Sequence, residues 1–320
     1  MSAAGPSELS DVPELGNLAL SRADVDRATA RRSDDEWLAA AWADPGTRVL
    51  VVDNGQAMVR RAGDATELTF VPPAEAPDGV RFLLGIDPDG IVYFGVAAPL
   101  PQADAGKDGA PPGAARPASL REAGPLLSDR DAGLMTHAVA LSNWHAVHGH
   151  CPRCGAVTEP ILSGSARRCV VDGSDHFPRI DPAVIMLVTD PDDRCLLARN
   201  AQWPERRVSI LAGFVEPGES AEQAVAREVH EETGITVTGA RYVASQPWPM
   251  PHSLMLGFRA RATGNLEITV DAEEIAEANW FSRDELRAAV ASGEIKLPSR
   301  VSIAHRIIES WYGAPLGGAW

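Results

Sequence analysis

The strongest constraint on this chain is the segment at residues 213–235, which reads GFVEPGESAEQAVAREVHEETGI. Ser220 and Gln223 have the spacing of a capping box, in which each side chain satisfies a backbone N–H of the other residue at the start of a helix. Gly234 stands where a glycine commonly ends a helix. The segment therefore predicts a glycine-containing loop followed by a helix over residues 220–233.

Three glutamates, Glu228, Glu231 and Glu232, share one face of the predicted helix, because residues three and four apart are neighbours there. Like charges at this spacing destabilise a bare helix, so the cluster favours a counter-cation. Carboxylate oxygens suit hard divalent cations, and we expect Mg²⁺ or Mn²⁺. An exposed, solvated acidic helix is the alternative. It leaves unexplained why Arg227 and a glycine-rich loop accompany the glutamates at fixed spacing.

The whole segment matches the pattern G-x5-E-x7-R-E-U-x-E-E-x-G-U, where U is an aliphatic residue. This pattern resembles the Nudix box, the signature of hydrolases of nucleoside diphosphates linked to another group. The resemblance implies an α/β (α+β) fold, the Nudix α/β/α sandwich, with the box as loop, helix and loop. The matching residues are Gly213, Glu219, Arg227, Glu228, Val229, Glu231, Glu232, Gly234 and Ile235.

The resemblance also implies roles for the residues of the box. In that family the glutamates at positions 228, 231 and 232 would hold the catalytic divalent metals. Arg227 would orient them through charge-assisted hydrogen bonds. The backbone carbonyl of Ala212, just before the box, would also help to hold the metal.

A proline-rich stretch, SQPWPMPHSLM at residues 245–255, follows the box. Its prolines stiffen the backbone, so it could form a rigid wall of a nucleotide pocket. An irregular connection with Trp248 in the core is the alternative. The stretch looks like the SQPWPFPxS array of the NADH pyrophosphatase branch, with Met250 in place of phenylalanine. The substrate-binding residues that this resemblance implies are Gln246, Pro247, Trp248, Pro249, Met250, Pro251, His252 and Ser253.

Four further residues stand at positions that the same branch uses. Phe177 and Phe214 are candidates to stack on the dinucleotide, and ordinary core packing is the alternative for Phe177. Glu274, in a D-x-x-E-I stretch, would be an additional metal ligand or the base that activates water, whereas the alternative is an exposed surface residue. Ala304, in a terminal S-I-A segment, would contact the substrate through its backbone.

Cys151 and Cys154 form a C-x-x-C pair, which is typical of one half of a structural zinc site. The resembled branch carries a second such pair. This chain instead has Cys169 and, three residues later, Asp172. We expect these four residues to hold one structural Zn²⁺ per subunit, because a carboxylate oxygen can ligate zinc.

The sequence does not decide which residue is the fourth zinc ligand. Asp175 and His176 lie close enough in the sequence to compete with Asp172. The alternative to a zinc site is weak or absent binding, with the module held together by packing. Cys195 is expected to be a small core residue and not a ligand.

The rest of the chain suggests three parts. Residues 1–128 are expected to form an N-terminal mixed α/β domain with a flexible loop at 101–119, and residues 129–178 a linking helix plus a zinc-ribbon-like module. Residues 179–320 would be the Nudix domain. Strand-like runs with turn residues between them occur at residues 47–52, 67–71, 80–86, 91–96, 183–189, 194–199, 236–244 and 255–262.

The charge balance narrows the classes of partner. Asp and Glu number 44 against 29 for Lys and Arg, which gives a net charge of −15. This argues against a broad basic surface for duplex nucleic acid or for an anionic membrane. The sequence has no apolar run long enough to cross a membrane and no signal-like start, so the expected location is the cytoplasm.

The resemblance implies metal-dependent hydrolysis of the pyrophosphate of NAD(H) to NMN(H) and AMP, with removal of NAD caps from RNA 5′ ends as a further activity. It also implies a homodimer in which the zinc module contributes to the shared site. One alternative is a hydrolase that prefers another dinucleotide or ADP-ribose. Another is a non-catalytic nucleotide sensor, which would be expected to carry a broken box, whereas this box is intact.

Overall fold

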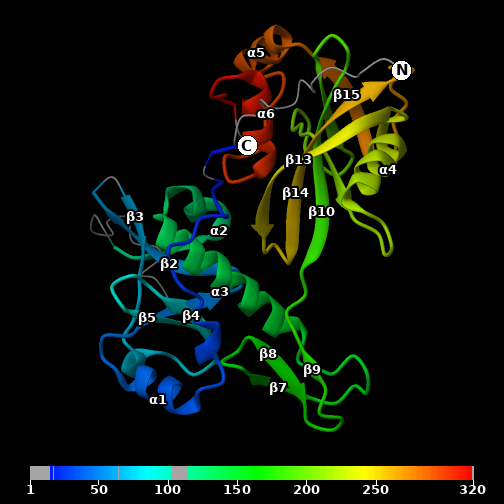
Figure 1. Ribbon diagram of the computed structural model, residues 1–320. Coiled ribbons are helices and arrows are strands. Elements are labelled where there is room, and N and C mark those ends of the chain that lie inside the picture. Colours follow the sequence, from blue (N-terminus) through cyan, green and yellow to red (C-terminus); the bar gives the residue numbers. More distant parts are fainter. Residues whose placement is uncertain (1–14, 17, 64, 102–113, 319–320) are drawn as a thin grey trace, which may run out of the picture. The chain divides into compact units, whose positions relative to one another are not determined.

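The computed structural model describes residues 15–16, 18–63, 65–101 and 114–318, and it divides into two compact units (Figure 1). The first unit holds Asp181–Gln246, Leu254–Trp320 and the described residues up to Leu18. The second holds Ala19–Ile180 and Pro247–Ser253. Each unit contains a six-stranded sheet of its own.

The first unit contains a six-stranded sheet with the order β13-β14-β10-β11-β15, and β12 pairs with β10. The pairs β10–β11, β10–β12 and β11–β15 are antiparallel. Its strands are β10 (Asp181–Thr189), β11 (Cys195–Asn200), β12 (Leu211–Phe214), β13 (Thr236–Trp248), β14 (Ser253–Thr263) and β15 (Ile275–Phe281).

Helices cover both faces of this sheet (Figure 1). Val184 and Met186 of β10 pack in one apolar core with α4 (Ala221–Thr233). The alternate residues Ile185 and Leu187 pack in another core with α5 (Arg283–Ser292) and α6 (Ile303–Tyr312). Because successive strand residues point to opposite faces, the two cores lie on opposite sides of the sheet. The predicted α/β/α sandwich is confirmed.

The second unit has a six-stranded sheet of its own, with the order β3-β2-β1-β5-β4 and with β6 beside β2. Only β1–β5 is parallel among its described pairs. The strands are β1 (Arg48–Asp53), β2 (Gln56–Ala62), β3 (Ala65–Leu68), β4 (Val80–Ile86), β5 (Val92–Ala97) and β6 (Arg116–Ser119). The short helical turns are η1 (Thr29–Arg31), η2 (Pro73–Glu75) and η3 (Gly124–Leu126).

Helices of the second unit also lie on both sides of its sheet. Leu83 of β4 belongs to the apolar core that includes residues of α1 (Asp35–Ala43). The neighbouring Phe82 stacks on His145 of α3 (Asp129–Val147), with the ring centres 6.2 Å apart. A short helix, α2 (Leu120–Ala123), directly follows β6. The predicted N-terminal α/β domain is thus confirmed as mixed α/β.

A small three-stranded sheet completes the second unit. It consists of β7 (Thr158–Ile161), β8 (Ala166–Cys169) and β9 (Asp175–His176), all antiparallel. Cys151 and Cys154 lie in the loop before β7, whereas Cys169 ends β8 and Asp172 lies in the loop between β8 and β9.

The structure tests only part of the prediction that residues 101–119 form a loop. Residues 102–113 lie outside the described residues. Arg116–Ser119 is not loop but strand β6, because it pairs with the edge of β2. The strand β2 itself was not predicted, since its sequence QAMVRRA does not alternate between apolar and polar residues. Within the described ranges, none of the helices is long and apolar enough to cross a membrane.

Candidate functional site

Helix α4 has the ends that its sequence predicts. Ser220 Oγ accepts from the N–H of Gln223 (3.3 Å), and Gln223 Oε1 accepts from the N–H of Ser220 (2.8 Å), so the capping box is confirmed. Gly234 ends the helix with φ 70°, a left-handed conformation that suits glycine. The apolar Val225 and Val229 are fully buried against the sheet, which fixes the rotation of the helix about its axis.

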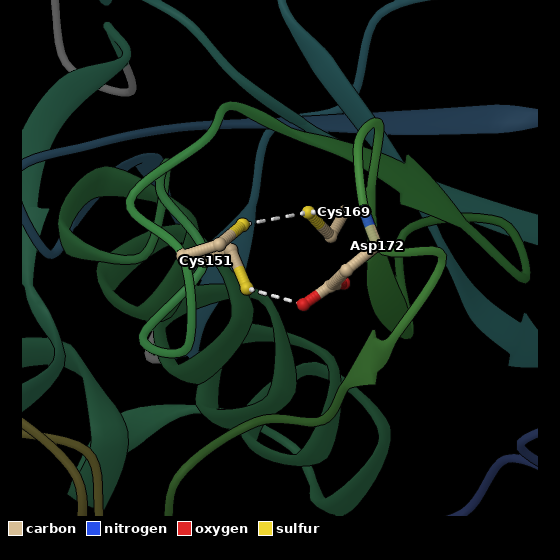
Figure 2. A group of neighbouring side chains, drawn as sticks. Cys151, Cys169 and Asp172 are labelled. Atoms are coloured by element: carbon tan, nitrogen blue, oxygen red, sulfur yellow. Dashed lines mark hydrogen bonds between the residues drawn. The ribbon is translucent and has the colours of Figure 1, made fainter.

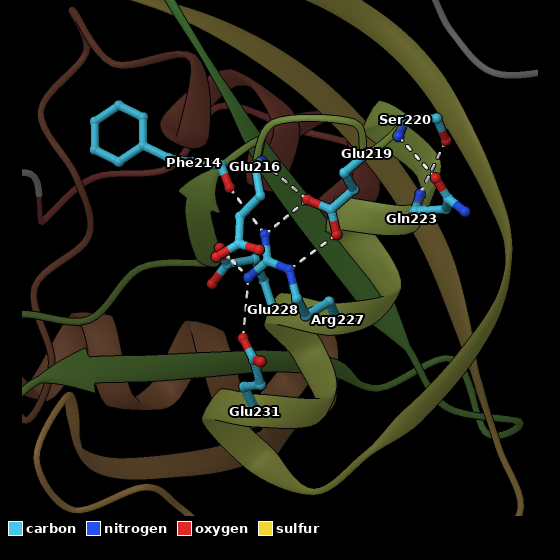
Figure 3. A network of polar contacts seen from close by, with 8 residues as sticks. All are labelled: Phe214, Glu216, Glu219, Ser220, Gln223, Arg227, Glu228 and Glu231. Atoms are coloured by element: carbon cyan, nitrogen blue, oxygen red, sulfur yellow. Dashed lines mark hydrogen bonds and ion pairs between the residues drawn. The ribbon is translucent and has the colours of Figure 1, made fainter.

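Arg227 lies at the centre of a polar network that ties the loop to the helix (Figure 3). Its Nε and Nη2 donate to the two carboxylate oxygens of Glu219 at 2.8 and 2.9 Å. Its Nη1 donates to Glu228 (2.8 Å) and Glu231 (2.9 Å). Nη2 also donates to the carbonyl of Phe214 (2.9 Å). These contacts raise the pKa of Arg227, chiefly through Glu219, and hold the pKa of Glu219 below its usual range.

Glycine at position 213 makes room for Glu228. A Cβ added to Gly213 would lie 1.9 Å from Cδ of Glu228 and 2.0 and 2.2 Å from its two oxygens. Gly213 belongs to β12, which pairs with β10, so the strand backbone directly abuts the carboxylate. The packing therefore requires glycine at this point of the box.

Glu232 is buried, with 6% of its surface exposed, and its Oε2 has no hydrogen-bond partner among the described residues. Burial raises its pKa to about 8, with further contributions from the charges of Glu228, Glu274 and Glu231. Burial also raises the pKa of Glu228, although Arg227 opposes the shift. An unpaired buried carboxylate is costly unless a cation compensates it.

Glu274 lies next to this cluster from a distant part of the sequence. Its charge contributes to the raised pKa of both Glu228 and Glu232, after burial as the main cause. The turn that carries it is closed by the N–H of Glu274 donating to the carbonyl of Asp271 (3.2 Å). Ala212 lies on β12, opposite Ile185 of β10 and beside Gly213.

The donor set fits a divalent cation. It offers carboxylate oxygens from Glu228, Glu231, Glu232 and Glu274, and such hard ligands suit hard cations. Oε2 of Glu232 accepts no hydrogen bond from the described residues, so this oxygen can serve as a metal ligand. Glu219 and Gly213 also help to hold the carboxylates in place, since Glu219 binds Arg227 and Gly213 makes room for Glu228. The ligand prediction did not include them, although their positions in the box were the signal that could have found them.

The two predicted stacking aromatics are both exposed. Phe214 of β12 has 57% of its surface exposed, and its ring points away from the Arg227 network (Figure 3). Phe177 has 65% exposed and follows β9 in the second unit. Neither is a core residue, so the core alternative for Phe177 is wrong.

The proline-rich stretch is not an irregular connection, because it forms the end of β13, a turn and the start of β14. Gln246 is fully buried, and its Nε2 donates to the carbonyl of Val301 (2.9 Å) just before α6. Its side chain therefore holds the start of α6 and is not displayed at the surface. The other predicted array residues, 247–253, belong to the second unit.

Ala304 lies at the start of α6, and its side chain is buried in the core of the first unit. Its N–H donates to Oγ of Ser302, the residue that caps the helix (3.2 Å). The predicted substrate contact through its backbone stays a prediction.

The second cluster of possible metal ligands comprises Cys151, Cys154, Cys169 and Asp172, whose ligand atoms all lie within 4.8 Å of one another. Figure 2 shows the side chains of Cys151, Cys169 and Asp172 converging from two loops. Sγ of Cys151 lies 3.6 Å from Oδ2 of Asp172, and Sγ of Cys154 lies 3.5 Å from Sγ of Cys169. The arrangement fits a four-ligand zinc site.

The two loops have the same local geometry. In one, the N–H of Gly155 donates to the carbonyl of Cys151 (2.9 Å); in the other, the N–H of Gly173 donates to the carbonyl of Cys169 (3.1 Å). Both glycines have positive φ, 75° and 70°. Asp172 thus occupies the position in its loop that Cys154 occupies in the first.

The competing candidates for the fourth ligand are engaged in other contacts. Asp175 accepts from Nε and Nη2 of Arg168 at 2.7 and 3.0 Å. Nε2 of His176 lies 3.1 Å from Oγ of Ser174. The geometry therefore favours Asp172.

Comparisons with known proteins agree with this arrangement. The NUDIX domain family model matches residues 179–300, the NADH pyrophosphatase-like rudimentary NUDIX domain matches residues 46–144, and the NADH pyrophosphatase zinc ribbon domain matches residues 147–177. A solved NUDIX hydrolase from Nitrosomonas europaea is 27% identical, with a TM-score of 0.34, over 43% of this chain and 94% of that one.

Curated relatives are more similar over the whole length. The NAD-capped RNA hydrolase NudC of Mycobacterium bovis is 44% identical over 308 residues, which cover 91% of this chain and 94% of the relative. The NAD-capped RNA hydrolase NUDT12 of Homo sapiens is 40% identical over 58% of this chain and 42% of its own length. The chain therefore belongs to the Nudix hydrolase family, in the NADH pyrophosphatase branch that combines a rudimentary Nudix domain, a zinc ribbon and a Nudix domain.

Proposed function

We propose that this protein hydrolyses the pyrophosphate bond of NAD(H), giving NMN(H) and AMP, and that it removes NAD caps from RNA 5′ ends. The observation that carries the proposal is the buried carboxylate of Glu232, whose Oε2 has no partner in the described structure, inside an intact Nudix box in which Arg227 donates to Glu219 and Glu228. The relatives named NAD-capped RNA hydrolase support the choice of substrate.

Mg²⁺ or Mn²⁺ is the proposed catalytic ion, held by Glu228, Glu231, Glu232 and Glu274 with help from the carbonyl of Ala212. When bound, such an ion neutralises the diphosphate and lowers the pKa of a bound water. Arg227 keeps the carboxylates of Glu228 and Glu231 in place, since it donates to both.

Aromatic and array residues are the proposed holders of the base and ribose. Phe214 and Phe177 present exposed rings of the kind on which bases stack, and such stacking is worth about 1–3 kcal/mol per base. Residues 247–253 are proposed as a wall of the binding site. Gln246 contributes indirectly, because it anchors the segment before α6 through Val301.

Recognition of capped RNA would centre on the 5′ end. The net charge of −15 offers little attraction for a long phosphate backbone. The acidic cluster becomes attractive to a diphosphate only with its cations bound, because a bound cation inverts the local sign of the charge.

A structural zinc ion, one per subunit, is the second proposed cofactor, with Cys151, Cys154, Cys169 and Asp172 as its ligands. It would stabilise the ribbon and take no part in the chemistry, because a site filled by four protein ligands has no open position for water. The support is the convergence of the four ligand atoms and the matching geometry of the two loops.

A homodimer in the cytoplasm is the proposed state of the protein. Exposed apolar side chains of the ribbon region, which favour association, are Val157 (54%), Val170 (55%), Val171 (73%) and Phe177 (65%). The free cysteines of the ribbon suit a reducing compartment, since an oxidising one favours disulfides.

The test is a side-by-side rate measurement on NADH, ADP-ribose and NAD-capped RNA with Mg²⁺ or Mn²⁺. We expect NADH and the capped RNA to be cleaved, with loss of both activities in Glu232→Gln. Faster cleavage of ADP-ribose than of NADH and capped RNA would make ADP-ribose the preferred substrate in place of the proposed ones. Binding of NADH without any release of AMP would favour a nucleotide sensor.

A further inference from the structure

Residues 247–253 comprise the end of β13, the turn at 249–252 and the first residue of β14, and three of them are prolines. Proline has no N–H, so the backbone here has few donors with which to hold itself in a sheet. One internal contact closes the turn, because the N–H of Met250 donates to the carbonyl of Trp248 (2.7 Å). Side chains from elsewhere must therefore fix the segment to the rest of its unit.

Two side chains of the second unit do so. The guanidinium of Arg121 on α2 lies 4.7 Å from the ring centre of Trp248, within the range of a cation–π interaction. Nδ2 of Asn143 on α3 donates to the carbonyl of Pro249 (2.8 Å). Pro249 is buried, so this carbonyl contact is part of the packing of the turn.

Arg121 is itself held in a defined position. It follows β6, which pairs with β2, and its helix begins with a capping box between Ser119 and Glu122. Asn143 lies near the end of the long helix α3, next to the buried Trp144. Both residues fall within residues 46–144, the part that matches the rudimentary Nudix domain and lies outside the Nudix box.

We propose that Arg121 and Asn143 are positioning residues for the dinucleotide. They fix Trp248 and the following turn, and they thereby set the affinity for substrate. The inference rests on the proposed function, in which residues 247–253 form a wall of the binding site. It assigns the rudimentary domain a role in substrate recognition. Because both side chains act on residues 248–249 and neither belongs to the carboxylate cluster, the expected effect falls on KM and not on kcat.

The experiment compares the full-length variants Arg121→Ala and Asn143→Asp with the wild type on NADH. Asn143→Asp keeps the shape of the side chain but replaces its donor with an acceptor. We expect KM to rise about tenfold, equivalent to about 1.4 kcal/mol, with kcat within about twofold of the wild type. Hydrogen exchange should accelerate in the peptide that covers residues 247–253.

Two further variants separate positioning from general damage. Arg121→Lys keeps the cation without the planar guanidinium, so its KM should rise less than that of Arg121→Ala. Arg81→Ala is the matched control, because it removes an exposed guanidinium 3.3 Å from the ring centre of Trp42 in the same unit. It should keep the KM of the wild type.

The outcomes distinguish the inference from the function on which it rests. A wild-type KM in both Arg121→Ala and Asn143→Asp, with wild-type cleavage, would overturn the inference alone. An equal change in the Arg81→Ala control, or a loss of kcat without a change in KM, would also overturn it. A wild-type protein that releases no AMP from NADH would overturn the proposed function and the inference with it.

Discussion

Gly213 and Glu228 are fitted to each other so closely that a Cβ on the glycine would lie 1.9 Å from Cδ of the glutamate. The backbone of β12 thereby forms one wall of the space that holds the carboxylate, and Arg227 closes another by donating to its Oε1. The glutamate is held in place from two directions before any ion binds.

The first prediction concerns Gly213→Ala. The added methyl group must displace the carboxylate of Glu228, because 1.9 Å between the new Cβ and Cδ of Glu228 is far below van der Waals contact. We expect AMP release from NADH to fall about 100-fold, the size of effect seen when a preorganised charge-stabilising group is lost. Gly317→Ala is the control, since a Cβ there meets nothing within 4 Å. Equal activity in the two variants would show that the position of Glu228 does not matter.

The second prediction concerns Glu232→Gln. The change removes a buried carboxylate that lies among the charges of Glu228, Glu231 and Glu274. We expect the metal-free protein to melt at an equal or higher temperature, while AMP release falls at least about 100-fold. Calorimetry in chelator and a rate assay with metal measure the two effects. Glu222→Gln, on the exposed part of the same helix, should leave both unchanged.

A lower melting temperature for metal-free Glu232→Gln would contradict this account. It would mean that the carboxylate stabilises the fold through partners within the chain and needs no bound cation to compensate its burial.

The third prediction concerns the fourth zinc ligand. Asp172→Cys creates a four-thiolate site, in a loop with the same geometry as the loop of Cys151 and Cys154. A chelator should therefore remove bound zinc more slowly from this variant than from the wild type. Asp172→Ala should release it faster. Asp175→Ala is the control, because Asp175 pairs with Arg168. Rapid zinc loss from Asp175→Ala, with retention in Asp172→Ala, would transfer the ligand role to Asp175.

The fourth prediction is a pH dependence. Burial, with a smaller contribution from the charge of Arg167, lowers the pKa of His145 to about 4, although the bond to the Gly164 carbonyl opposes the shift. Arg167 can only donate, so Nδ1 of His145 accepts (2.9 Å) and Nε2 donates to Gly164 (2.8 Å). The unfolded chain binds this proton near pH 6.5 and the folded chain does not. Stability contributed by His145 is therefore complete above about pH 6.5 and is lost as the pH falls toward 4.

Unfolding free energies between pH 7 and 4.5 measure this effect. In His145→Gln the slope should be smaller by up to about 1.4 kcal/mol per pH unit, the value for one proton. The same slope in the variant and the wild type would show that His145 does not carry the dependence.

The features that the sequence predicted correctly are local ones. The helix α4, its capping box and the glycine at its end depend on residues within one segment, so spacing alone specifies them. The convergence of Cys151, Cys154 and Cys169 with Asp172 was likewise expected, because each half of the ribbon is a short loop.

The features that the sequence did not predict depend on tertiary packing. Gln246 was expected to face substrate, but its partner is the carbonyl of Val301, 55 residues further along the chain. Strand β12 was missed because four residues carry little periodicity, and β13 continues past Pro247, a residue type that usually ends a strand. The attachment of residues 248–249 to Arg121 and Asn143 has no local sequence signal at all.

Product analysis by mass spectrometry after incubation with NADH and Mg²⁺ or Mn²⁺ tests the central claim most directly. Hydrolysis of the pyrophosphate predicts AMP and NMNH in equal amounts from the wild type, and neither product from Glu232→Gln. The account would be contradicted by dihydronicotinamide and ADP-ribose as products, since the glycosidic bond would then be cleaved, or by intact NADH with the metal-loaded wild type.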